Sequence, residues 1–304
     1  MKFNKNADLD KLMTLLFEPY KESVSDVQKV SNALLDRGVI TSDTEIVNDH
    51  IAFRTLGVPF LGITSLEKIF LHYGYEKRDY YYFEAKKLNA YWYAPPAPEY
   101  PRIFISELRV SDLPAATIAV IKQYTKQVTS DPVDAMDLND VAAVGNFFYT
   151  SLWDLPTIED YTALAKESEY AAWVIYNRYY LNHYTISVHE LKNGYNTMET
   201  FNSFLVDIGI QLNTSGGIIK QSADGLLRQS SSVAKMMEAT FKNGEKMKIP
   251  GSYVEFAERL ALPEFKDIPK NQLVRTQRRD GFESANADKI FESTYASQTG
   301  SKTS

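Results

Sequence analysis

Two stretches of this chain, Asn48-Asp49-His50-Ile51-Ala52-Phe53-Arg54 and Asn182-His183-Tyr184-Thr185-Ile186-Ser187, share one pattern. Each has a histidine near its start, followed by β-branched and aromatic residues that favour a β-strand. These two histidines are half of the four that the chain contains. The match predicts two related structural units, each with a histidine at the start of its first strand.

The segments that follow the two strands also correspond. A helical stripe of apolar residues covers 65–73 in the first case and 197–205 in the second. We expect Ser65 to cap the first of these helices. The glycines that end the two helices, Gly74 and Gly209, lie 24 residues after the first histidine and 26 residues after the second. Duplication accounts for this likeness of order and spacing.

Further strand-like runs complete each unit. They are short and bounded by charged residues, glycines or prolines. The runs are 78–84, 88–93 and 103–110 in the first unit, and 216–221, 225–230, 235–241 and 252–259 in the second. The order predicts an α+β fold of two β-α-β-β-β modules whose concave faces can pack together.

The remaining segments have helical patterns or no apolar pattern. We expect two N-terminal helices with a break near residues 23–25, and a helical insert between the modules. The last residues are too polar to pack, which predicts a disordered tail. The expected organisation is one domain over 1–294, made of helices in 8–38, a first module in 45–112, the insert in 113–180 and a second module in 181–294, followed by the tail 295–304.

The composition argues against several classes of protein. The net charge is −6 and the lysines and arginines are scattered, so no nucleic-acid partner is expected. The chain has no cysteine, so a metal ion would have to be held by His, Asp or Glu. No apolar run approaches the roughly 20 residues that cross a bilayer, and the first ten residues are mostly polar. We therefore expect a soluble, cytoplasmic protein without a membrane partner.

One set of residues could form a metal site. Residues four apart in a strand lie on the same face, so His50 and Arg54 share a face of the first strand. If the modules pack by their concave faces, His50, His183 and Glu255 can converge from three strands. Two imidazoles and one carboxylate leave the other positions of an ion free for a substrate and O2, which suits ferrous iron. Arg54 would then present a guanidinium fork to a substrate carboxylate.

A structural interpretation of the same residues stays open at this point. A single histidine at the start of a strand is more often packed or capped than a metal ligand, and no pattern shows that Glu255 reaches the two histidines. His72 lies in a helical stripe and is expected to be partly buried structure. His189 lies six residues after His183, about 20 Å along a strand, which is too far for the same ion.

Three other features favour structural roles. The aromatic runs 80–83 and 91–93 are more typical of core and sheet surface than of a stacking platform. Gly216-Gly217 lacks the spacing of a phosphate-binding loop, and we interpret it as a turn. Ser230-Ser231-Ser232 lacks the glycines that surround the nucleophile of a serine hydrolase.

Five segments carry a likeness to a known family, namely DHIAFR (49–54), NHY (182–184), GLLRQSS (225–231), YVEFAER (253–259) and GFESANADKIFEST (281–294). Together they resemble the 2-oxoadipate dioxygenase/decarboxylase family, over about residues 8–294. The combination is more specific than any one segment. The chain is shorter than the bacterial enzymes of this family, which carry an additional insertion.

The resemblance implies a fold similar to the vicinal-oxygen-chelate superfamily and a metal centre. By position in the family motifs, His50, His183 and Glu255 would hold Fe(II) and face the substrate. Arg54 matches the arginine that binds the substrate in this family. The resemblance therefore implies that Arg54 is a catalytic residue in addition to the three metal ligands.

Three further residues are candidates for substrate contacts. Gln229 and Ser230 could orient substrate oxygens, and Ser284 matches a small-residue segment that lines the family's pocket.

The reaction implied by the resemblance has a 2-oxo acid and O2 as its partners. A 2-oxo acid would chelate the iron, lose CO2 and be hydroxylated in the same turnover, so that 2-oxoadipate becomes 2-hydroxyglutarate, a step of lysine catabolism. Two alternatives remain at this point. One is another metal-dependent enzyme of the same superfamily, such as a glyoxalase-like isomerase or a hydrolase, and the other is a non-catalytic protein that binds small acids.

Overall fold

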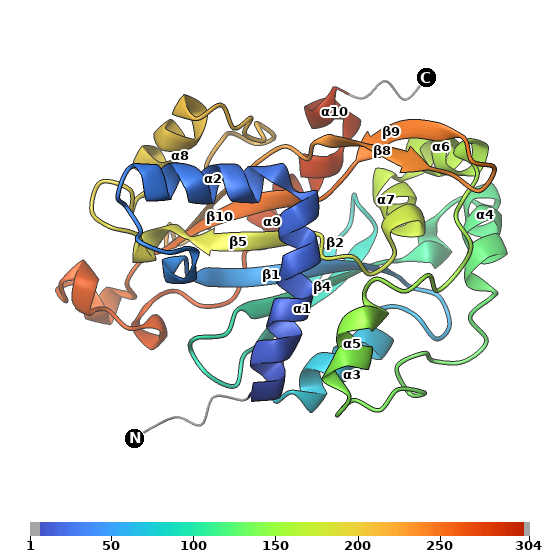
Figure 1. Ribbon diagram of the computed structural model, residues 1–304, viewed down its shortest axis with the longest axis horizontal. Helices are drawn as coiled ribbons and strands as arrows, with labels where there is room; N and C mark the ends of the chain where they lie inside the picture. Colours follow the sequence, from blue (N-terminus) through green and yellow to red (C-terminus); the bar gives the residue numbers. More distant parts are fainter. Residues whose placement is uncertain (1–6, 301–304) are drawn as a thin grey trace.

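The structure, a computed structural model, describes residues 7–300. Its centre is an eight-stranded curled sheet with the strand order β2-β3-β4-β1-β5-β10-β7-β6 (Figure 1). The strands of this sheet are β1 (Asn48–Leu56), β2 (Glu76–Phe83), β3 (Leu88–Ala94), β4 (Arg102–Leu108), β5 (His183–Ser187), β6 (Lys220–Gln221), β7 (Leu227–Ser231) and β10 (Tyr253–Arg259).

The strand order contains the same pattern twice. β1 pairs in parallel with β4, and β5 pairs in parallel with β10. β4 is antiparallel to β3, and β10 is antiparallel to β7, with β2 and β6 at the two edges. The two halves join where β1 pairs antiparallel with β5. The predicted α+β fold of two β-α-β-β-β modules is therefore confirmed.

The helices α3 (Ile63–His72) and α8 (Met198–Asp207) occupy corresponding places in the two modules. Each ends just before a glycine with positive φ, Gly74 at +86° and Gly209 at +73°, a conformation that side chains with a Cβ rarely adopt. The prediction that Ser65 caps α3 is wrong, because α3 begins two residues earlier and the Ser65 hydroxyl donates to Asp131 at 2.7 Å.

The remaining helices pack around the sheet. In Figure 1, α1 crosses in front of the central strands, α2 runs roughly along them above β10, and α4 to α7 lie to the right. Their bounds are α1 (Ala7–Ser23), α2 (Ser25–Asp36), α4 (Ala115–Thr125), α5 (Val141–Phe147), α6 (Ile158–Glu167), α7 (Glu169–Asn177), α9 (Ser284–Ile290) and α10 (Ala296–Thr299). Short 3-10 helices are η1 (Asp43–Glu45), η2 (Val110–Asp112), η3 (Val188–Glu190), η4 (Pro263–Phe265), η5 (Lys270–Gln272), η6 (Arg275–Gln277) and η7 (Phe291–Thr294).

β1 is buried on both faces from its second residue to its last. On one face, the Phe53 ring packs against Phe70 of α3 and Phe148 beside α5, with ring centroids 5.4 and 5.1 Å away. His50 and Arg54 are on the other face, under the C-terminal segment, and are 1% exposed. Burial of both faces explains why polar residues of β1 need partners inside the protein.

Two predictions about the second half of the chain are wrong. The expected strand 235–241 does not belong to the main sheet, because β8 (Met236–Thr240) pairs with β9 (Lys246–Pro250) in a separate hairpin. The expected disordered tail contains α10, and the backbone N–H of Ala296 donates to Glu169 at 2.8 Å. A polar segment can thus be ordered by a partner that is distant in sequence. Residues 301–304 lie outside the described residues, and the predicted domain limits stay a prediction.

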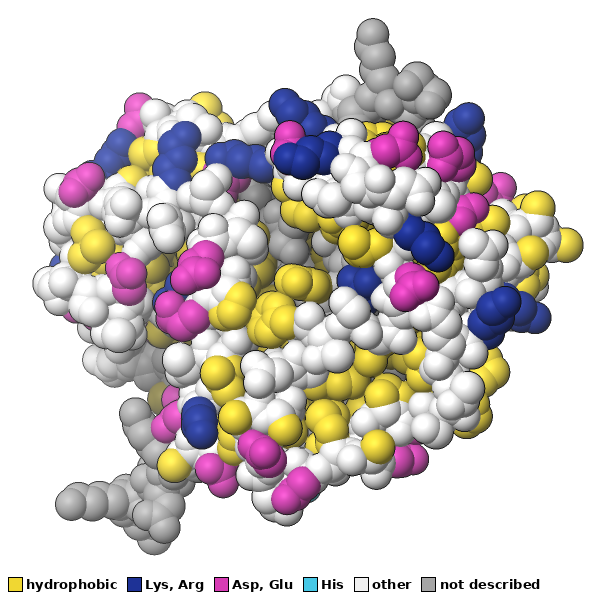
Figure 2. Space-filling model, turned by 45° about the vertical axis from the view of Figure 1, so that its right-hand side comes forward, with side chains coloured by type: hydrophobic (Ala, Val, Ile, Leu, Met, Phe, Trp, Pro, Cys, Tyr) yellow, Lys and Arg dark blue, Asp and Glu magenta, His cyan; other side chains and the backbone are white. Residues whose placement is uncertain are grey.

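The surface has mixed charge. In Figure 2, lysine and arginine side chains are interspersed with aspartate and glutamate over the visible face, without a single basic stripe. Within residues 7–300, no helix combines the length and the apolar character that a membrane span requires.

Candidate metal centre

Three ligand-type side chains meet at the centre of the sheet. His50 belongs to β1, His183 is the first residue of β5, and Glu255 lies on β10, so the three come from adjacent strands. One ligand atom from each lies within 4.8 Å of the others. No second group of this kind is found among residues 7–300. Strand pairing therefore brings together residues that are up to 205 positions apart.

The strand register explains why these side chains share a face. His183 is paired with Ala52 of β1 and with Tyr253 of β10. Paired residues project to the same face, and so do residues two apart in one strand. His50, two residues before Ala52, and Glu255, two residues after Tyr253, therefore both project to the face of His183.

The carboxylate of Glu255 lies between the two imidazoles. Its Oε1 is 3.4 Å from His50 Nε2, and its Oε2 is 3.1 Å from His183 Nε2. The imidazole rings are 5.4 Å apart and nearly perpendicular. All three side chains are buried, so the cluster is screened from bulk water.

The lowered pKa values of Glu255 and His183 favour metal binding, whereas the raised pKa of His50 opposes it. Burial by itself would raise the pKa of Glu255, but His50 and His183 outweigh it and lower that pKa to about 2. Burial lowers the pKa of His183, and Glu255 offsets this only in part. Burial also acts to lower the pKa of His50, but the carboxylates of Glu255 and Asp49 raise it. An ionised carboxylate beside imidazoles that can lose a proton is the state in which such groups bind metal ions.

Neighbouring side chains orient the cluster. His50 Nδ1 is 2.8 Å from Asp49 Oδ1, and His183 Nδ1 is 3.1 Å from Asn182 Oδ1, which leaves both Nε2 atoms toward Glu255. Gln229 donates through Nε2 to Glu255 Oε1 at 2.5 Å. Such outer contacts fix the direction of metal ligands.

The donor set fits a divalent transition metal. Two imidazole nitrogens and one carboxylate oxygen are the ligands that non-haem Fe(II) enzymes use, and these enzymes keep the other coordination positions for substrate and O2. His50, His183 and Glu255 would hold the ion. A hard cation such as Mg²⁺ prefers all-oxygen ligands and fits this set less well.

A narrow cavity adjoins the cluster. Its open volume is about 20 Å³, room for about one water molecule. The walls combine the cluster with aromatic and aliphatic side chains. The lining residues are His50, Ala52, Phe53, Arg54, Phe104, Ser106, Asn182, His183, Gln229, Tyr253, Glu255, Phe282, Ala287, Ile290 and Phe291.

Arg54 lines this cavity, as the spacing from His50 predicts. Its NH1 donates to Thr294 Oγ1 at 2.9 Å and its NH2 to the carbonyl of Phe291 at 3.0 Å. The guanidinium carbon lies 5.2 Å from the ring centroids of both Tyr170 and Trp173. Arg54 Nε has no hydrogen-bond partner although it is buried. The fork is therefore held in place by the C-terminal segment and retains an unused donor.

The three further candidates have different outcomes. Gln229 lines the cavity and contacts Glu255. Ser230 and Ser284 are not among the residues that line it, and their substrate contacts stay a prediction. Ser230 points to the opposite face and donates to Asn202 at 2.7 Å, because adjacent strand residues alternate. Ser284 begins α9 half-buried, and Ala287 and Ile290 line the cavity instead.

Sequence reasoning missed several residues of the site. Asp49 contacts His50, and Asn286 donates to Gln229 Oε1 at 2.9 Å. The Phe282 ring packs edge-on against His50 at 4.8 Å. Tyr253 also lines the cavity. The alternation of strand residues could have predicted its position, because it lies two residues before Glu255 on the same face of β10. The partners of the others are set by long-range packing.

The two other histidines stand apart from the cluster. His72 is exposed at the end of α3, so the expectation of a partly buried residue is wrong. His189 Nδ1 accepts a hydrogen bond from the backbone N–H of Arg259 at 3.2 Å. Burial lowers the pKa of His189 to about 3, so this imidazole is neutral and structural.

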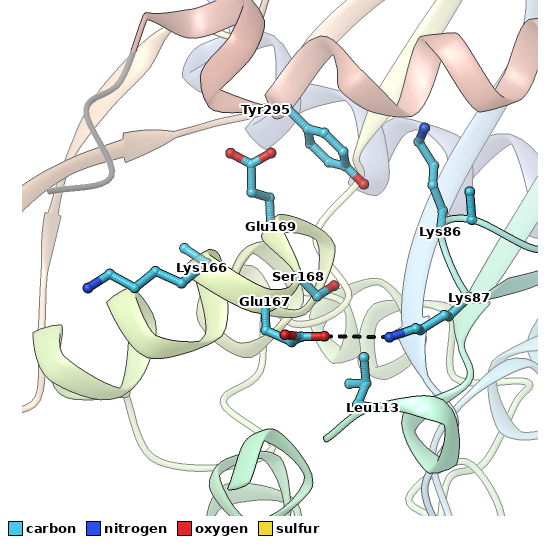
Figure 3. A pocket seen from close by; sticks show the side chains of 10 residues that line it. Lys86, Lys87, Leu113, Lys166, Glu167, Ser168, Glu169 and Tyr295 are labelled. Atoms are coloured by element: carbon cyan, nitrogen blue, oxygen red, sulfur yellow. Dashed lines mark hydrogen bonds and ion pairs between the residues drawn. The ribbon is translucent and has the colours of Figure 1, made fainter. Parts of the chain in front are cut away.

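A second hollow lies beside α6 and α7, about 430 Å³ in volume (Figure 3). Three lysines line it, Lys86, Lys87 and Lys166, together with Glu167 and Glu169. Lys87 is 3.5 Å from Glu167. Charges of both signs line this hollow and no residue of the His-His-Glu cluster takes part, so it does not compete with the metal centre.

The curled sheet of two related units, with ligand-type residues at its centre, has a fold of the vicinal-oxygen-chelate type. A glyoxalase superfamily protein from Ralstonia eutropha has a similar fold, with a TM-score of 0.67 over 90% of this chain and 85% of that one, at 19% identity. The expected fold similarity is confirmed.

More specific comparisons define the family. The profile of the 2-oxoadipate dioxygenase/decarboxylase family matches residues 12–268. The chain is 44% identical over 272 residues to a chloroplastic 2-oxoadipate dioxygenase/decarboxylase from Arabidopsis thaliana, covering 86% of this chain and 71% of that protein. The crystal structure of hydroxyglutarate synthase with 2-oxoadipate from Oryza sativa has a TM-score of 0.88 at 39% identity, over 97% of this chain and 95% of that one. The chain belongs to the 2-oxoadipate dioxygenase/decarboxylase family.

The expectation of a cytoplasmic protein is wrong. The curated plant relatives are chloroplastic, or chloroplastic and amyloplastic. Composition and packing of a folded domain do not encode a compartment, because targeting signals are read by receptors.

Proposed function

We propose that this protein is an Fe(II)-dependent dioxygenase that converts 2-oxoadipate and O2 to 2-hydroxyglutarate and CO2. The observation that carries the proposal is the convergence of His50, His183 and Glu255 within 4.8 Å beside a cavity that Arg54 lines. The names of the relatives and the match to hydroxyglutarate synthase support the same reaction.

The three residues of the cluster would act as metal ligands. Bound Fe(II) would supply open coordination positions for a 2-oxo acid and O2, and would pass electrons from the 2-oxo acid to O2. Gln229 keeps the Glu255 carboxylate aligned between the imidazoles through its 2.5 Å hydrogen bond. Asn286 in turn fixes the amide of Gln229.

Arg54 is suited to hold the distal carboxylate of a dicarboxylic substrate. It lies four residues after His50 on the same face of β1, about 13 Å along the strand. An acid with carboxylates at both ends could reach from the cluster to the guanidinium once the residues that cover the cavity move aside. A planar fork positions a carboxylate in one orientation, and this would place the carbon to be hydroxylated beside the metal.

The walls of the cavity exclude water. Phe104, Phe282, Ile290 and Phe291 contribute apolar surface around the cluster. A dry site strengthens the attraction between Arg54 and a carboxylate, and keeps solvent from competing for the metal.

The proposed reaction is balanced in atoms. The carboxylate next to the keto group leaves as CO2, one oxygen atom of O2 completes the new carboxylate, and the other becomes the hydroxyl group of 2-hydroxyglutarate. The substrate supplies all the electrons, so no second reductant is required.

Reconstitution under controlled oxygen tests the proposal. Protein loaded anaerobically with Fe(II) should consume O2 on addition of 2-oxoadipate and release CO2 and 2-hydroxyglutarate in equal amounts. Protein loaded with Zn²⁺ is the matched control and should consume no O2. Iron-loaded protein that consumes no O2 with 2-oxoadipate would overturn the proposal, and turnover with Zn²⁺ alone would favour an isomerase or a hydrolase.

A further inference from the structure

The two imidazoles of the cluster have different neighbours behind them. His50 Nδ1 faces the carboxylate of Asp49 at 2.8 Å, whereas His183 Nδ1 faces the amide oxygen of Asn182 at 3.1 Å. Each neighbour is the residue that directly precedes its histidine. The two halves therefore have this contact at the same position, but the side chain that makes it is charged in the first half and neutral in the second.

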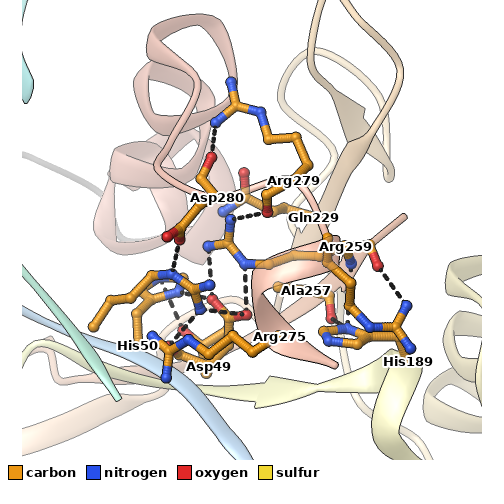
Figure 4. A network of polar contacts seen from close by, with 12 residues as sticks. Asp49, His50, His189, Gln229, Ala257, Arg259, Arg275, Arg279 and Asp280 are labelled. Atoms are coloured by element: carbon orange, nitrogen blue, oxygen red, sulfur yellow. Dashed lines mark hydrogen bonds and ion pairs between the residues drawn. The ribbon is translucent and has the colours of Figure 1, made fainter. Parts of the chain in front are cut away.

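Asp49 is held by a bidentate ion pair with Arg259. Arg259 Nε is 2.7 Å from Asp49 Oδ2, and Arg259 NH2 is 2.9 Å from Asp49 Oδ1 (Figure 4). Both residues are almost completely buried. Arg102 approaches the same carboxylate, with NH1 at 3.4 Å from Oδ2. A forked guanidinium fixes the plane of the carboxylate and therefore the direction in which it faces His50.

Local strand geometry places Asp49 beside the imidazole. The pairing of β1 with β5 shifts register between Asn48 and Ile51. Regular alternation would direct Asp49 and His50 to opposite faces, and such an irregularity re-aims a side chain. The Asp49 carboxylate can thus reach both His50 and Arg259 on the face of the cluster.

Arg259 also holds part of the cavity wall. Its NH1 donates to the carbonyl of Gly281 at 2.7 Å and to that of Arg279 at 3.1 Å. Phe282, the next residue, packs against the Arg259 guanidinium at 5.6 Å and against the His50 ring at 4.8 Å. The Arg259 guanidinium thus contacts both Asp49 and the backbone that leads into Phe282.

A second buried ion pair offers an internal comparison. Glu258, the neighbour of Arg259 on β10, accepts from Arg228 NH1 at 3.1 Å and from the backbone N–H of Met198 at 3.0 Å. Glu258 is 2% exposed, as Asp49 is. It points away from the His-His-Glu cluster, so its loss should affect stability without affecting the metal.

We propose that Asp49 and Arg259 are positioning residues that make His50 the more strongly donating imidazole of the metal centre. A carboxylate behind an imidazole fixes its tautomer and increases its donor strength. The neutral Asn182 provides orientation to His183 without this charge. The inference rests on the proposed function only in treating the cluster as a metal site.

Metal affinity of the apo-protein tests the inference. Asp49→Asn gives the first half the neutral neighbour that the second half already has. Fe(II) titrated anaerobically against a competing chelator should bind Asp49→Asn about 10- to 100-fold more weakly than the parent. Glu258→Gln also replaces a buried carboxylate by an amide, and should bind Fe(II) within twofold of the parent although its Tm falls.

Arg259→Lys provides a second variant that keeps the charge and loses the fork. Its Fe(II) affinity should fall between those of the parent and Asp49→Asn, and it carries the test if Asp49→Asn does not fold. Folded Asp49→Asn or Arg259→Lys protein that binds Fe(II) within twofold of the parent would overturn the inference. A parent protein that binds no Fe(II) would instead overturn the proposed function.

Discussion

Glu255 is a glutamate inside a strand whose every residue is buried. An isolated buried carboxylate is expensive, and in most proteins it is paired or bound to a metal ion. Here the imidazoles of His50 and His183 flank it and hold its pKa at about 2. The side chain therefore stays charged inside the protein, where its negative charge can attract a cation.

Glu255→Gln tests the role of that charge. The amide has nearly the same shape, but it does not supply the negative charge that helps to hold a divalent cation. We expect purified Glu255→Gln protein to lose most of its iron and activity with its far-UV circular dichroism unchanged. Metal analysis by mass spectrometry checks this, and stoichiometric iron in the variant would contradict the assignment.

Arg54→Lys separates substrate binding from metal binding. Lysine keeps the charge but lacks the fork, and it also loses the paired contacts to Thr294 and the Phe291 carbonyl. We expect unchanged iron content and a KM for 2-oxoadipate raised at least about tenfold, which corresponds to about 1.4 kcal/mol.

Steady-state kinetics with saturating Fe(II) measures this change, and Arg37→Lys on the surface is the matched control. Arg37 pairs with the exposed Asp207 and neither residue lines the cavity, so its variant should match the parent. An unchanged KM in Arg54→Lys would remove Arg54 from the substrate site.

Single elements decide which residues of the sequence reach the site. On β7, Gln229 faces Glu255 while the adjacent Ser230 faces α8, since the side chains of a strand alternate. The C-terminal elements α9 and η7 cover the cavity with Ala287, Ile290 and Phe291. A short segment, residues 284–294, therefore covers the cavity beside the candidate metal centre.

That covering segment must move when substrate enters. A cavity of about 20 Å³ holds about one water molecule, much less than a six-carbon diacid. We expect amides of 284–294 to exchange hydrogen faster than those of β10 in the iron-loaded protein, and to slow when 2-oxoadipate is added without O2. Exchange followed by mass spectrometry measures this. The matched segment 236–250, which forms the distant β8–β9 hairpin, should not change, and equal protection of 284–294 in both states would contradict the expectation.

The stability of the whole molecule should depend on pH through His189. Its pKa is lowered to about 3 by burial, below the ordinary value of about 6.5. Below about pH 6.5 the unfolded chain takes up a proton at this imidazole that the folded protein does not, so the free energy of unfolding falls as the pH decreases toward 3. Between pH 7 and 5 the contribution of His189 is about 2 kcal/mol.

Urea unfolding of His189→Gln at the two pH values measures this contribution. Glutamine can accept the hydrogen bond from the backbone N–H of Arg259 but does not titrate. The parent should lose about 2 kcal/mol more than the variant between pH 7 and 5. His72→Gln, at an exposed position, should follow the parent. Equal losses in the parent and in His189→Gln would show that His189 does not contribute.

At the scale of the molecule, the two modules contribute different groups to one centre. The first supplies His50 and Arg54, and the second supplies His183 and Glu255. The antiparallel pairing of β1 with β5 is what joins them. Because the ligands come from both halves, an ion bound at this centre would link the two modules.

Local patterns were sufficient for much of this structure. Helical and alternating periodicities predicted the two modules and put His50, His183 and Glu255 on strands from which they can converge. The resemblance to the family then named these three residues as ligands. These features are local because a residue's place on a helix or strand face follows from its spacing alone. The likeness of five motifs to one family added the proposed chemistry, and the family is confirmed.

Only the tertiary structure decided which partners these residues have. Asp49 pairs with Arg259, 210 positions away, and the polar tail is ordered through Glu169. The β8–β9 hairpin leaves the sheet, and Ser230 turns from the site that Gln229 enters. The sequence by itself determined the repeated units and their chemical groups. Contacts between distant segments depend on how strands register and helices pack, and those are set by the burial of the whole chain rather than by neighbouring residues.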